Sequence, residues 1–269
     1  EGPVRLRAGG RASLTGATGE LLLSPRAGLS VPLPTGTVPK ASWGLYHYTP
    51  TDPRVLDAAL GNPEIGSERA AHYVLGVDQG IPLPGEESGG LLRVEAYHIV
   101  LSDLVVVTDD SDAVRAGETW TNAGSGTNRG LDLLLGVRTG RWASTTTYSL
   151  LFAERTNPLA TRFSQSYAPA QDQRHTFGSS TEYQVSPAWR TTLRYSFHTG
   201  RPVSAVVASG SDKAAIACVN CDRLGNFHNI DVRAEWRRAL ETYRLSVYIE
   251  VLNAGNFKSD FVPLVTVED

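Results

Sequence analysis

The sequence predicts an all-β protein, an antiparallel up-and-down transmembrane β-barrel of about eleven or twelve strands. Short turns alternate with long polar loops along the whole chain, and apolar and polar residues alternate with a period of two between them. The alternating segments are also roughly 9 to 12 residues long, and a tilted strand that crosses a membrane needs about 9 to 11. A sheet of this kind has short turns on one rim and long loops on the other.

The expected strands follow one another without a composition break, so we treat residues 1–269 as one unit. They lie near 4–14, 21–33, 37–48, 68–81, 90–101, 119–138, 141–153, 174–185, 189–199, 227–238 and 243–253. A twelfth is expected to start after Phe257. One short helix is expected at Pro53–Leu60, because Pro53 suits a first helical position and Asp52 can cap it.

Five of the strands justify the assignment most clearly because each has one apolar and one polar face. In chain order, the apolar residues are Leu92, Val94 and Ala96; Leu131, Leu133, Leu135 and Val137; Trp189, Leu193, Tyr195 and Phe197; Ile230, Val232, Ala234 and Trp236; and Leu245, Val247, Ile249 and Val251. Between them lie Arg93, Glu95 and Tyr97; Asp132 and Arg138; Arg190, Thr192, Arg194, Ser196 and His198; Asp231, Arg233, Glu235 and Arg237; and Arg244, Ser246, Tyr248 and Glu250. Thr191 is the exception on an apolar face.

The connections predict how the strands are oriented. Short turns centre on Pro34-Thr35-Gly36, Pro84-Gly85-Glu86, Thr139-Gly140-Arg141, Ser186-Pro187-Ala188 and Ala239-Leu240-Glu241. Longer polar stretches separate them, at 49–66, 102–122, 154–173 and 199–226. We expect the turns to face the periplasm, and the loops that hold Pro53, Asp110, Tyr167 and Cys218 to face the exterior.

Tryptophans next to the turns separate a membrane barrel from a soluble sandwich, which would show the same alternation. Trp142, Trp189 and Trp236 lie at or beside short turns, where a barrel places an aromatic girdle. Trp43 and Tyr195 are expected further along the lipid-facing side. The alternative is that these rings are scattered core residues.

Composition excludes several function classes. A net charge of -3 with no dense run of Lys or Arg does not fit a nucleic-acid binder. The longest apolar runs, such as 104–107 and 150–153, are too short for a membrane helix, which needs about 20 residues. The chain starts at Glu1 and contains no Met, so we expect a processed form or an internal fragment.

The two cysteines form a C-x-x-C pair, Cys218 and Cys221, inside the longest loop. This spacing is compatible with a redox motif, half of a zinc site or a small-loop disulfide. No second Cys pair and no βαβ pattern accompany it, which favours a structural disulfide in an oxidising compartment. A metal site and free thiols remain the alternatives.

Motifs of enzymes and cofactor sites are missing from the sequence. The six histidines show no H-x-x-x-H or H-E-x-x-H spacing, and no G-x-S-x-G or P-loop occurs. Asp109, Asp110 and Asp112 cluster in a loop without an acidic partner at a suitable spacing. We therefore expect no catalytic residues, no metal site and no cofactor.

The order of several short motifs resembles the C-terminal half of the barrel of TonB-dependent outer-membrane receptors. The matching segments are 23–29 (LSPRAGL), 41–47 (ASWGLYH), 62–68 (NPEIGSE) with Gly76, 122–132 with its Asn-Ala-Gly and Gly-Leu-Asp, 200–202 (GRP) and 251–256 (VLNAGN). The resemblance implies about half of a barrel of about 22 strands. Neither the family's plug domain nor its TonB-contacting box is visible, and the last residues lack the family's terminal aromatic.

The resemblance implies a portion of a receptor in the Gram-negative outer membrane that takes up a scarce ligand, such as a siderophore-iron complex. The partners would be this small molecule, outer-membrane lipid, and the TonB complex through the missing N-terminal region. Inward-facing positions near the loop-side strand ends give the candidate ligand contacts Tyr46, Tyr48, His72, His198, Asn229 and Asp231. Arg201 lies just beyond such an end and is expected to pair with an anionic carboxylate or iron chelate. The alternatives are a passive porin or structural barrel and, less favoured, a secreted β-sandwich hydrolase.

Other polar and glycine residues have expected structural roles. Gly124, Gly130 and Gly200 are expected to permit bends and bulges near strand ends. Glu68, at the head of a strand, is expected to accept hydrogen bonds from nearby backbone N–H groups. Asn253 and Asn256 are expected to cap a turn.

Overall fold

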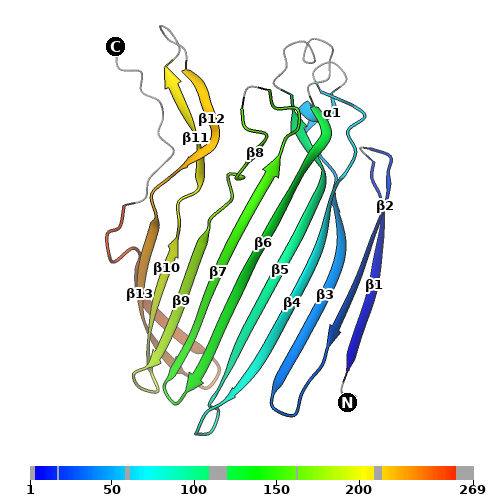
Figure 1. Cartoon of the computed structure of the whole chain (residues 1–269). Helices are drawn as coiled ribbons and strands as arrows, with labels where there is room; N and C mark the ends of the chain where they lie inside the picture. Colours follow the sequence, from blue (N-terminus) through cyan, green and yellow to red (C-terminus); the bar gives the residue numbers. More distant parts are fainter. Residues whose placement is uncertain are drawn as a thin grey trace.

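The structure, a computed structural model, describes residues 4–16, 18–57, 61–108, 120–161, 163–208 and 214–258. A sheet of twelve strands dominates it (Figure 1). Its main path runs in chain order and every pairing is antiparallel, which confirms the predicted fold class. The path consists of β1 (Arg5–Leu14), β2 (Leu21–Ser30), β3 (Thr37–Tyr48), β4 (Glu68–Pro82), β5 (Gly89–Val107), β6 (Trp120–Thr139), β7 (Trp142–Thr156), β9 (His175–Gln184), β10 (Trp189–His198), β13 (Phe227–Ala239) and β14 (Arg244–Val251).

Three short elements lie off this path. β8 (Ser166–Tyr167) pairs with the end of β7. β11 (Pro202–Ala208) and β12 (Ala214–Arg223) form a separate hairpin above β10 and β13 (Figure 1). The sequence prediction of one long loop over 199–226 was therefore wrong. The hairpin follows the strand alternation only loosely, because its register shifts on either side of Ala205.

The remaining expected elements agree with the structure to within about three residues, except at the end of β5 and in the helix. β5 continues to Val107, beyond the expected end at 101, because a bulge at Asp103, whose φ is 59°, lets pairing with β6 resume. The helix α1 covers only Pro53–Leu56, and part of the expected range, 58–60, lies outside the described residues. So does most of the region expected to hold a twelfth strand after Phe257.

The five short turns expected from the sequence lie at one end of the sheet, and the long loops lie at the other, together with the turn between β1 and β2 (Figure 1). Glycines with positive φ make three of the turns possible: Gly36 at 77°, Gly85 at 109° and Gly140 at 50°. We call these two rims the turn side and the loop side.

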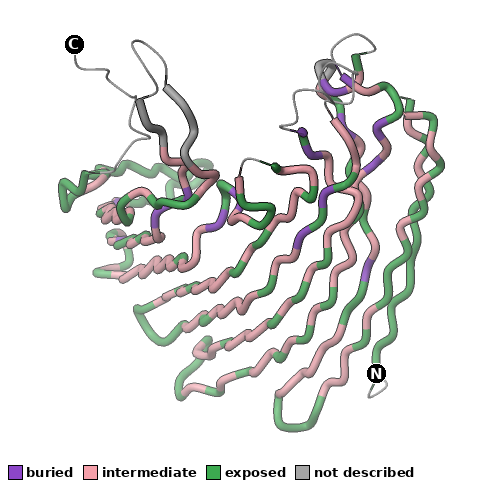
Figure 2. The backbone as a smooth tube through the Cα atoms, turned by 45° about the horizontal axis from the view of Figure 1, so that its top comes forward, coloured by how far each residue is buried: buried purple, intermediate pink, exposed green. Residues whose placement is uncertain are grey.

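The main path is open, since β1 and β14 stand at its two ends and do not pair with each other in the described part of the chain. The sheet curves, and most strand residues are half-buried or exposed (Figure 2). The buried apolar side chains of the described residues are Val55, Ile65 and Val106, which lie at the loop side. Among the described helices, none is long and apolar enough to cross a membrane.

Candidate ligand-binding wall

Strand register divides the sheet into an apolar face and a polar face. Leu75, Ala96, Leu131 and Leu150 lie side by side across four strands of the apolar face. Side chains on this face are widely exposed: Leu75 to 67%, Leu193 to 51% and Ile249 to 75%. An apolar surface of this extent on one side of an antiparallel sheet is typical of a wall that faces lipid.

An aromatic belt crosses the apolar face near the turn side, as predicted. The Trp142 and Tyr183 rings are 4.4 Å apart between centroids, and Trp189 lies directly opposite Trp236. Trp142 is 53% exposed and Trp189 48%. Trp43 and Tyr195 also lie on this face, further from the turns.

A second belt crosses the same face toward the loop side, and the sequence analysis missed its histidines. Tyr148 and His175 are joined by a hydrogen bond of 2.9 Å between Oη and Nδ1, and Tyr195 and His228 by another of 2.9 Å. Phe197 packs on His228 with ring centroids 4.9 Å apart. His228 precedes Ile230 and Val232 on β13 at intervals of two residues, so its side chain lies on the same apolar face. This alternation could have placed His228 on the apolar face from the sequence.

The spacing of the two belts fits a membrane. Trp189 and Phe197 are eight residues apart on β10, which is about 26 Å along a strand. At a tilt of about 40° this distance is about 20 Å along the membrane normal, close to the apolar band of an outer-membrane barrel.

The polar face carries two groups of ion pairs. In one, Lys40 and Arg93 both lie 2.8 Å from Asp78. In the other, four arginines pair with three acidic side chains: Arg190, Arg194, Arg233 and Arg237 with Glu182, Glu235 and Glu250. Cross-strand charge pairs of this kind are typical of a hydrated interior wall.

A hollow of about 710 Å³ runs along the polar face of β1 to β5. Tyr46 and His72 line it, with ring centroids 4.5 Å apart. The Tyr46 ring lies over Gly44, where an added Cβ would stand 2.9 Å from the ring. Gly44 therefore allows the ring to lie flat against the sheet and beside His72. Tyr48, on the same strand face, is 61% exposed and does not line the hollow.

Cations outnumber acids in the hollow. Its charged lining consists of Arg5, Arg7, Arg26, Lys40 and Arg93 against Asp78 and Glu95. Asp78 and Glu95 are already engaged with Lys40 and Arg93. Within the described chain, Arg7 and Arg26 have no such carboxylate partner. The hollow can therefore attract an anionic ligand.

The other predicted ligand contacts lie on β10, β13 and the following loop, away from the hollow. Asn229 donates to Asp231 Oδ1 at 2.9 Å, and the same oxygen accepts from the Asn253 backbone at 2.9 Å. His198 Nδ1 lies 2.8 Å from Gln173 Nε2, and its ring stacks on Phe227. Asp231 and His198 thus hold the local structure together, whereas the Arg201 side chain is exposed. The structure does not bring this group next to Tyr46 and His72.

Polar side chains hold the loop-side ends of β4, β5 and β6 together. Glu68 Oε1 accepts the Val105 backbone N–H at 2.9 Å, which is the role expected of it. Asn122 Oδ1 accepts from the Gly66 backbone N–H at 2.8 Å, and Asn122 Nδ2 donates to the Asp103 carbonyl at 2.8 Å. Ile65, next to Gly66 in the chain, is buried, with 1% of its surface exposed.

Glu20 ties the turn between β1 and β2 to the start of β4. Its Oε2 accepts the Ser67 hydroxyl at 2.7 Å and the Ser67 backbone N–H at 2.9 Å, and Thr18 donates to it at 2.7 Å. The Ser67 hydroxyl, followed by that of Thr18, lowers the pKa of Glu20 below its ordinary value.

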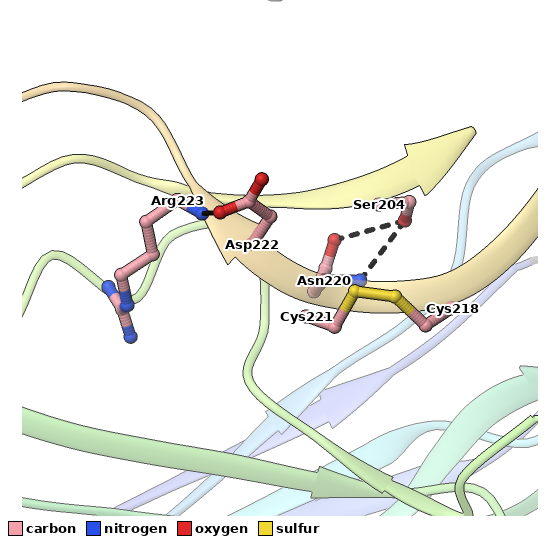
Figure 3. Close-up of a disulfide and its surroundings, with 6 residues drawn as sticks. All are labelled: Ser204, Cys218, Asn220, Cys221, Asp222 and Arg223. Carbon is pink, nitrogen blue, oxygen red and sulfur yellow. Dashed lines mark hydrogen bonds between the residues drawn. A yellow bond between two sulfur atoms is a disulfide. The ribbon is translucent and has the colours of Figure 1, made fainter. Parts of the chain in front are cut away.

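The hairpin β11–β12 is fastened to the loop that precedes β9. Cys218 and Cys221 are joined by a disulfide with Cα atoms 5.9 Å apart, and Asn220 between them has φ of 50° (Figure 3). Asn220 donates through its backbone to Ser204 Oγ at 3.1 Å and through Nδ2 to the Ala168 carbonyl at 2.8 Å.

An arginine completes this attachment. Arg223 Nη1 donates to the Asp172 carbonyl at 2.7 Å and to the Gly200 carbonyl at 3.1 Å, while Nη2 pairs with the Asp172 carboxylate. Asp172 is fully buried. Sequence reasoning missed this pair because 51 residues separate its members.

The expected structural roles of the glycines need partial correction. Gly124 lies at the β5–β6 bulge, as expected, where an added Cβ would meet Val106 at 2.5 Å. Gly130 lies inside β6 and not at a strand end; an added Cβ would collide with the Leu150 carbonyl and the Tyr97 hydroxyl. At Gly200, an added Cβ would collide with the backbone carbonyl of Leu224. Asn253 caps its turn through bonds of 2.9 Å to the Phe257 N–H and carbonyl.

The described residues contain no group of three or more His, Cys, Asp or Glu placed to hold a metal ion. Asp109, Asp110 and Asp112 lie outside the described residues. Besides the carboxylates of Asp78 and Glu95, which are paired with Lys40 and Arg93, the hollow is lined by guanidinium, ammonium, phenol and imidazole groups, which suit reversible binding of an anion.

Comparisons with known proteins agree with this architecture. The family model described as "TonB dependent receptor-like, beta-barrel" matches residues 2–254. Among curated proteins, none matches this sequence.

Solved structures with a similar fold have low sequence identity. The ferric-catecholate import receptor Fiu from K12 E. coli is 14% identical, with a TM-score of 0.64 over 89% of this chain and 32% of its own. The outer membrane transporter YddB from Escherichia coli is 11% identical, with a TM-score of 0.66 over 96% of this chain and 40% of its own. The FrpB iron transporter from Neisseria meningitidis is 18% identical, with a TM-score of 0.65 over 96% of this chain and 39% of its own. This chain thus spans about a third to two fifths of their length.

Proposed function

This chain belongs to the TonB-dependent receptor β-barrel family, and on that premise we propose that it forms part of the wall of a receptor in a Gram-negative outer membrane. The two aromatic belts and the exposed apolar face between them support a place in the membrane. The receptor takes up a scarce ligand and releases it inward with energy delivered by TonB through a region outside this chain.

The ligand is an anion such as a siderophore-iron complex. The observation that carries this proposal is the excess of cations in the hollow, which Arg7 and Arg26 line together with Tyr46 and His72. Guanidinium groups donate paired, charge-assisted hydrogen bonds to carboxylate or catecholate oxygens. Fiu, whose fold is similar, is named for the import of ferric catecholates.

Uptake of iron-55 bound to a catecholate or to a hydroxamate chelator tests this function in cells that produce the full-length receptor. We expect saturable, TonB-dependent uptake of at least one chelate. The double substitution Arg7→Gln and Arg26→Gln should lower uptake at subsaturating chelate about a hundredfold or more, since each of the two lost charge-assisted hydrogen bonds costs about 1.5 kcal/mol or more.

The matched control is Arg138→Gln, which removes an exposed arginine of the polar face outside the hollow. Non-saturable uptake that persists without TonB would identify a passive porin instead. Uptake that the double substitution leaves unchanged would show that the hollow does not bind the ligand.

A further inference from the structure

Two guanidinium groups flank one aromatic ring on the apolar face. Phe152 of β7 is 39% exposed. Arg129 of β6 has its Cζ 5.8 Å from the ring centroid, and Arg174, just before β9, has its Cζ 4.2 Å from it. Since β6 and β9 are the two neighbours of β7, the cations approach from both sides. We call Arg129, Phe152 and Arg174 the arginine–phenylalanine patch.

The patch lies at the loop-side edge of the lipid-facing surface. Arg129 stands directly opposite Phe152 in the sheet, and the next pair toward the turns on the same face is Leu131 with Leu150. The bonded pair Tyr148 and His175 of the loop-side belt lies beside it. A charged group at this level meets lipid headgroups, with acyl chains immediately below.

The cations of the patch have spare hydrogen-bonding capacity. Arg174 Nη2 lies 3.2 Å from Asp172, but that carboxylate also pairs with Arg223, and Arg174 Nε is buried without a hydrogen-bond partner. Arg129 is exposed and has no ion pair within the described chain. Glu154, two residues after Phe152 on the same face of β7, accepts from Ser166. Stacking on a ring leaves the N–H edges of a guanidinium free to donate.

We infer that the arginine–phenylalanine patch binds the phosphate group of a membrane lipid in the leaflet on the loop side, with the lipid's chains lying on Leu131 and Leu150. A lipid fits better than free phosphate, because the cations adjoin an exposed apolar surface that a soluble anion would not cover. The inference rests on the membrane location in the proposed function and is independent of the transported ligand.

Lipid binding to the purified full-length receptor tests the inference. In uncharged detergent micelles, native mass spectrometry measures the affinity for dioleoyl phosphatidic acid, with dioleoylglycerol as the lipid that lacks phosphate. We expect Arg129→Gln to weaken phosphatidic acid binding about fivefold to tenfold, since one cation near the headgroups is worth about this factor. Arg129→Lys should change it less than about twofold, and Arg138→Gln, at the turn side, should leave it unchanged.

A second variant keeps the test decisive if Arg129→Gln does not fold, as judged by heat-modifiable gel mobility. Phe152→Leu retains both charges but removes the ring that orients them, and should weaken binding about threefold. Equal affinities of the wild type and the folded variants would overturn the inference, as would equal binding of dioleoylglycerol or full displacement by millimolar inorganic phosphate. A receptor absent from the outer membrane would refute the proposed function, whereas a membrane receptor with these equal affinities would refute only the inference.

Discussion

Removing the Arg223 side chain should loosen the β11–β12 hairpin without unfolding the barrel sheet. Arg223 donates to the Asp172 carbonyl, the Asp172 carboxylate and the Gly200 carbonyl. Arg223→Ala would leave the carboxylate of Asp172, which is fully buried, with Arg174 as its remaining partner at 3.2 Å. The hairpin lies outside the main sheet path, so its opening does not require the barrel strands to separate.

The magnitude follows from these contacts. Breaking a buried ion pair by removing one partner typically costs about 3 to 5 kcal/mol. Arg223 is 36% exposed and Arg174 still offers partial compensation, so we expect about 2 to 3 kcal/mol. The free energy of local opening falls by this amount, which is about a 30- to 150-fold loss of amide protection.

Hydrogen exchange monitored by mass spectrometry measures this loss over β11 and β12, with β4 and β5 as internal references. Arg201→Ala is the matched control, because Arg201 is exposed and lies at the same end of the hairpin. Protection of β11 and β12 that is equal in wild type and Arg223→Ala would refute the reasoning. So would an equal loss over the whole sheet.

Two further predictions concern the turn between β1 and β2 and the middle of β6. The hydrogen bonds of Glu20 lower its pKa, so the stability that its carboxylate contributes is present above the ordinary pKa of about 4.5 and is lost as pH falls through the lowered pKa. Glu20→Gln should therefore remove this acid-dependent step from the melting temperature of the receptor measured against pH. Identical pH profiles of the wild type and the variant would contradict this reasoning. Gly130→Ala places a methyl group against the Leu150 carbonyl and the Tyr97 hydroxyl, so we expect a smaller fraction of folded protein, measured by heat-modifiable gel mobility. Adding Tyr97→Ala to this variant should restore folding only in part, because the contact with the Leu150 backbone remains. Undiminished folding of Gly130→Ala would show that β6 and β7 can separate.

The barrel strands and their faces were predictable from local sequence because membrane-spanning strands must alternate strictly. β3 was predicted with the observed bounds, 37–48, and the apolar parity of β14 holds throughout. The role of Glu68 could also be predicted, since an acidic residue at the head of a strand finds backbone N–H groups close by.

The candidate site was predicted only in part. Polar parity selected Tyr46 and His72, which do meet. It also selected Asp231 and His198, which bind neighbouring side chains and backbone instead. Parity states which face a residue occupies but not whether its hydrogen-bonding capacity is already used.

The sequence by itself determined the all-β class, the order of the barrel strands, the division into an apolar and a polar face, and the separation of turn and loop sides. These properties depend on period-two alternation and on turn residues, which are local. Only the tertiary structure decided that Arg223 reaches Asp172, that Arg129 and Arg174 share Phe152, and that cations exceed acids in the hollow. Those contacts join residues from different strands and loops, and their geometry depends on register and loop path, which no local pattern encodes.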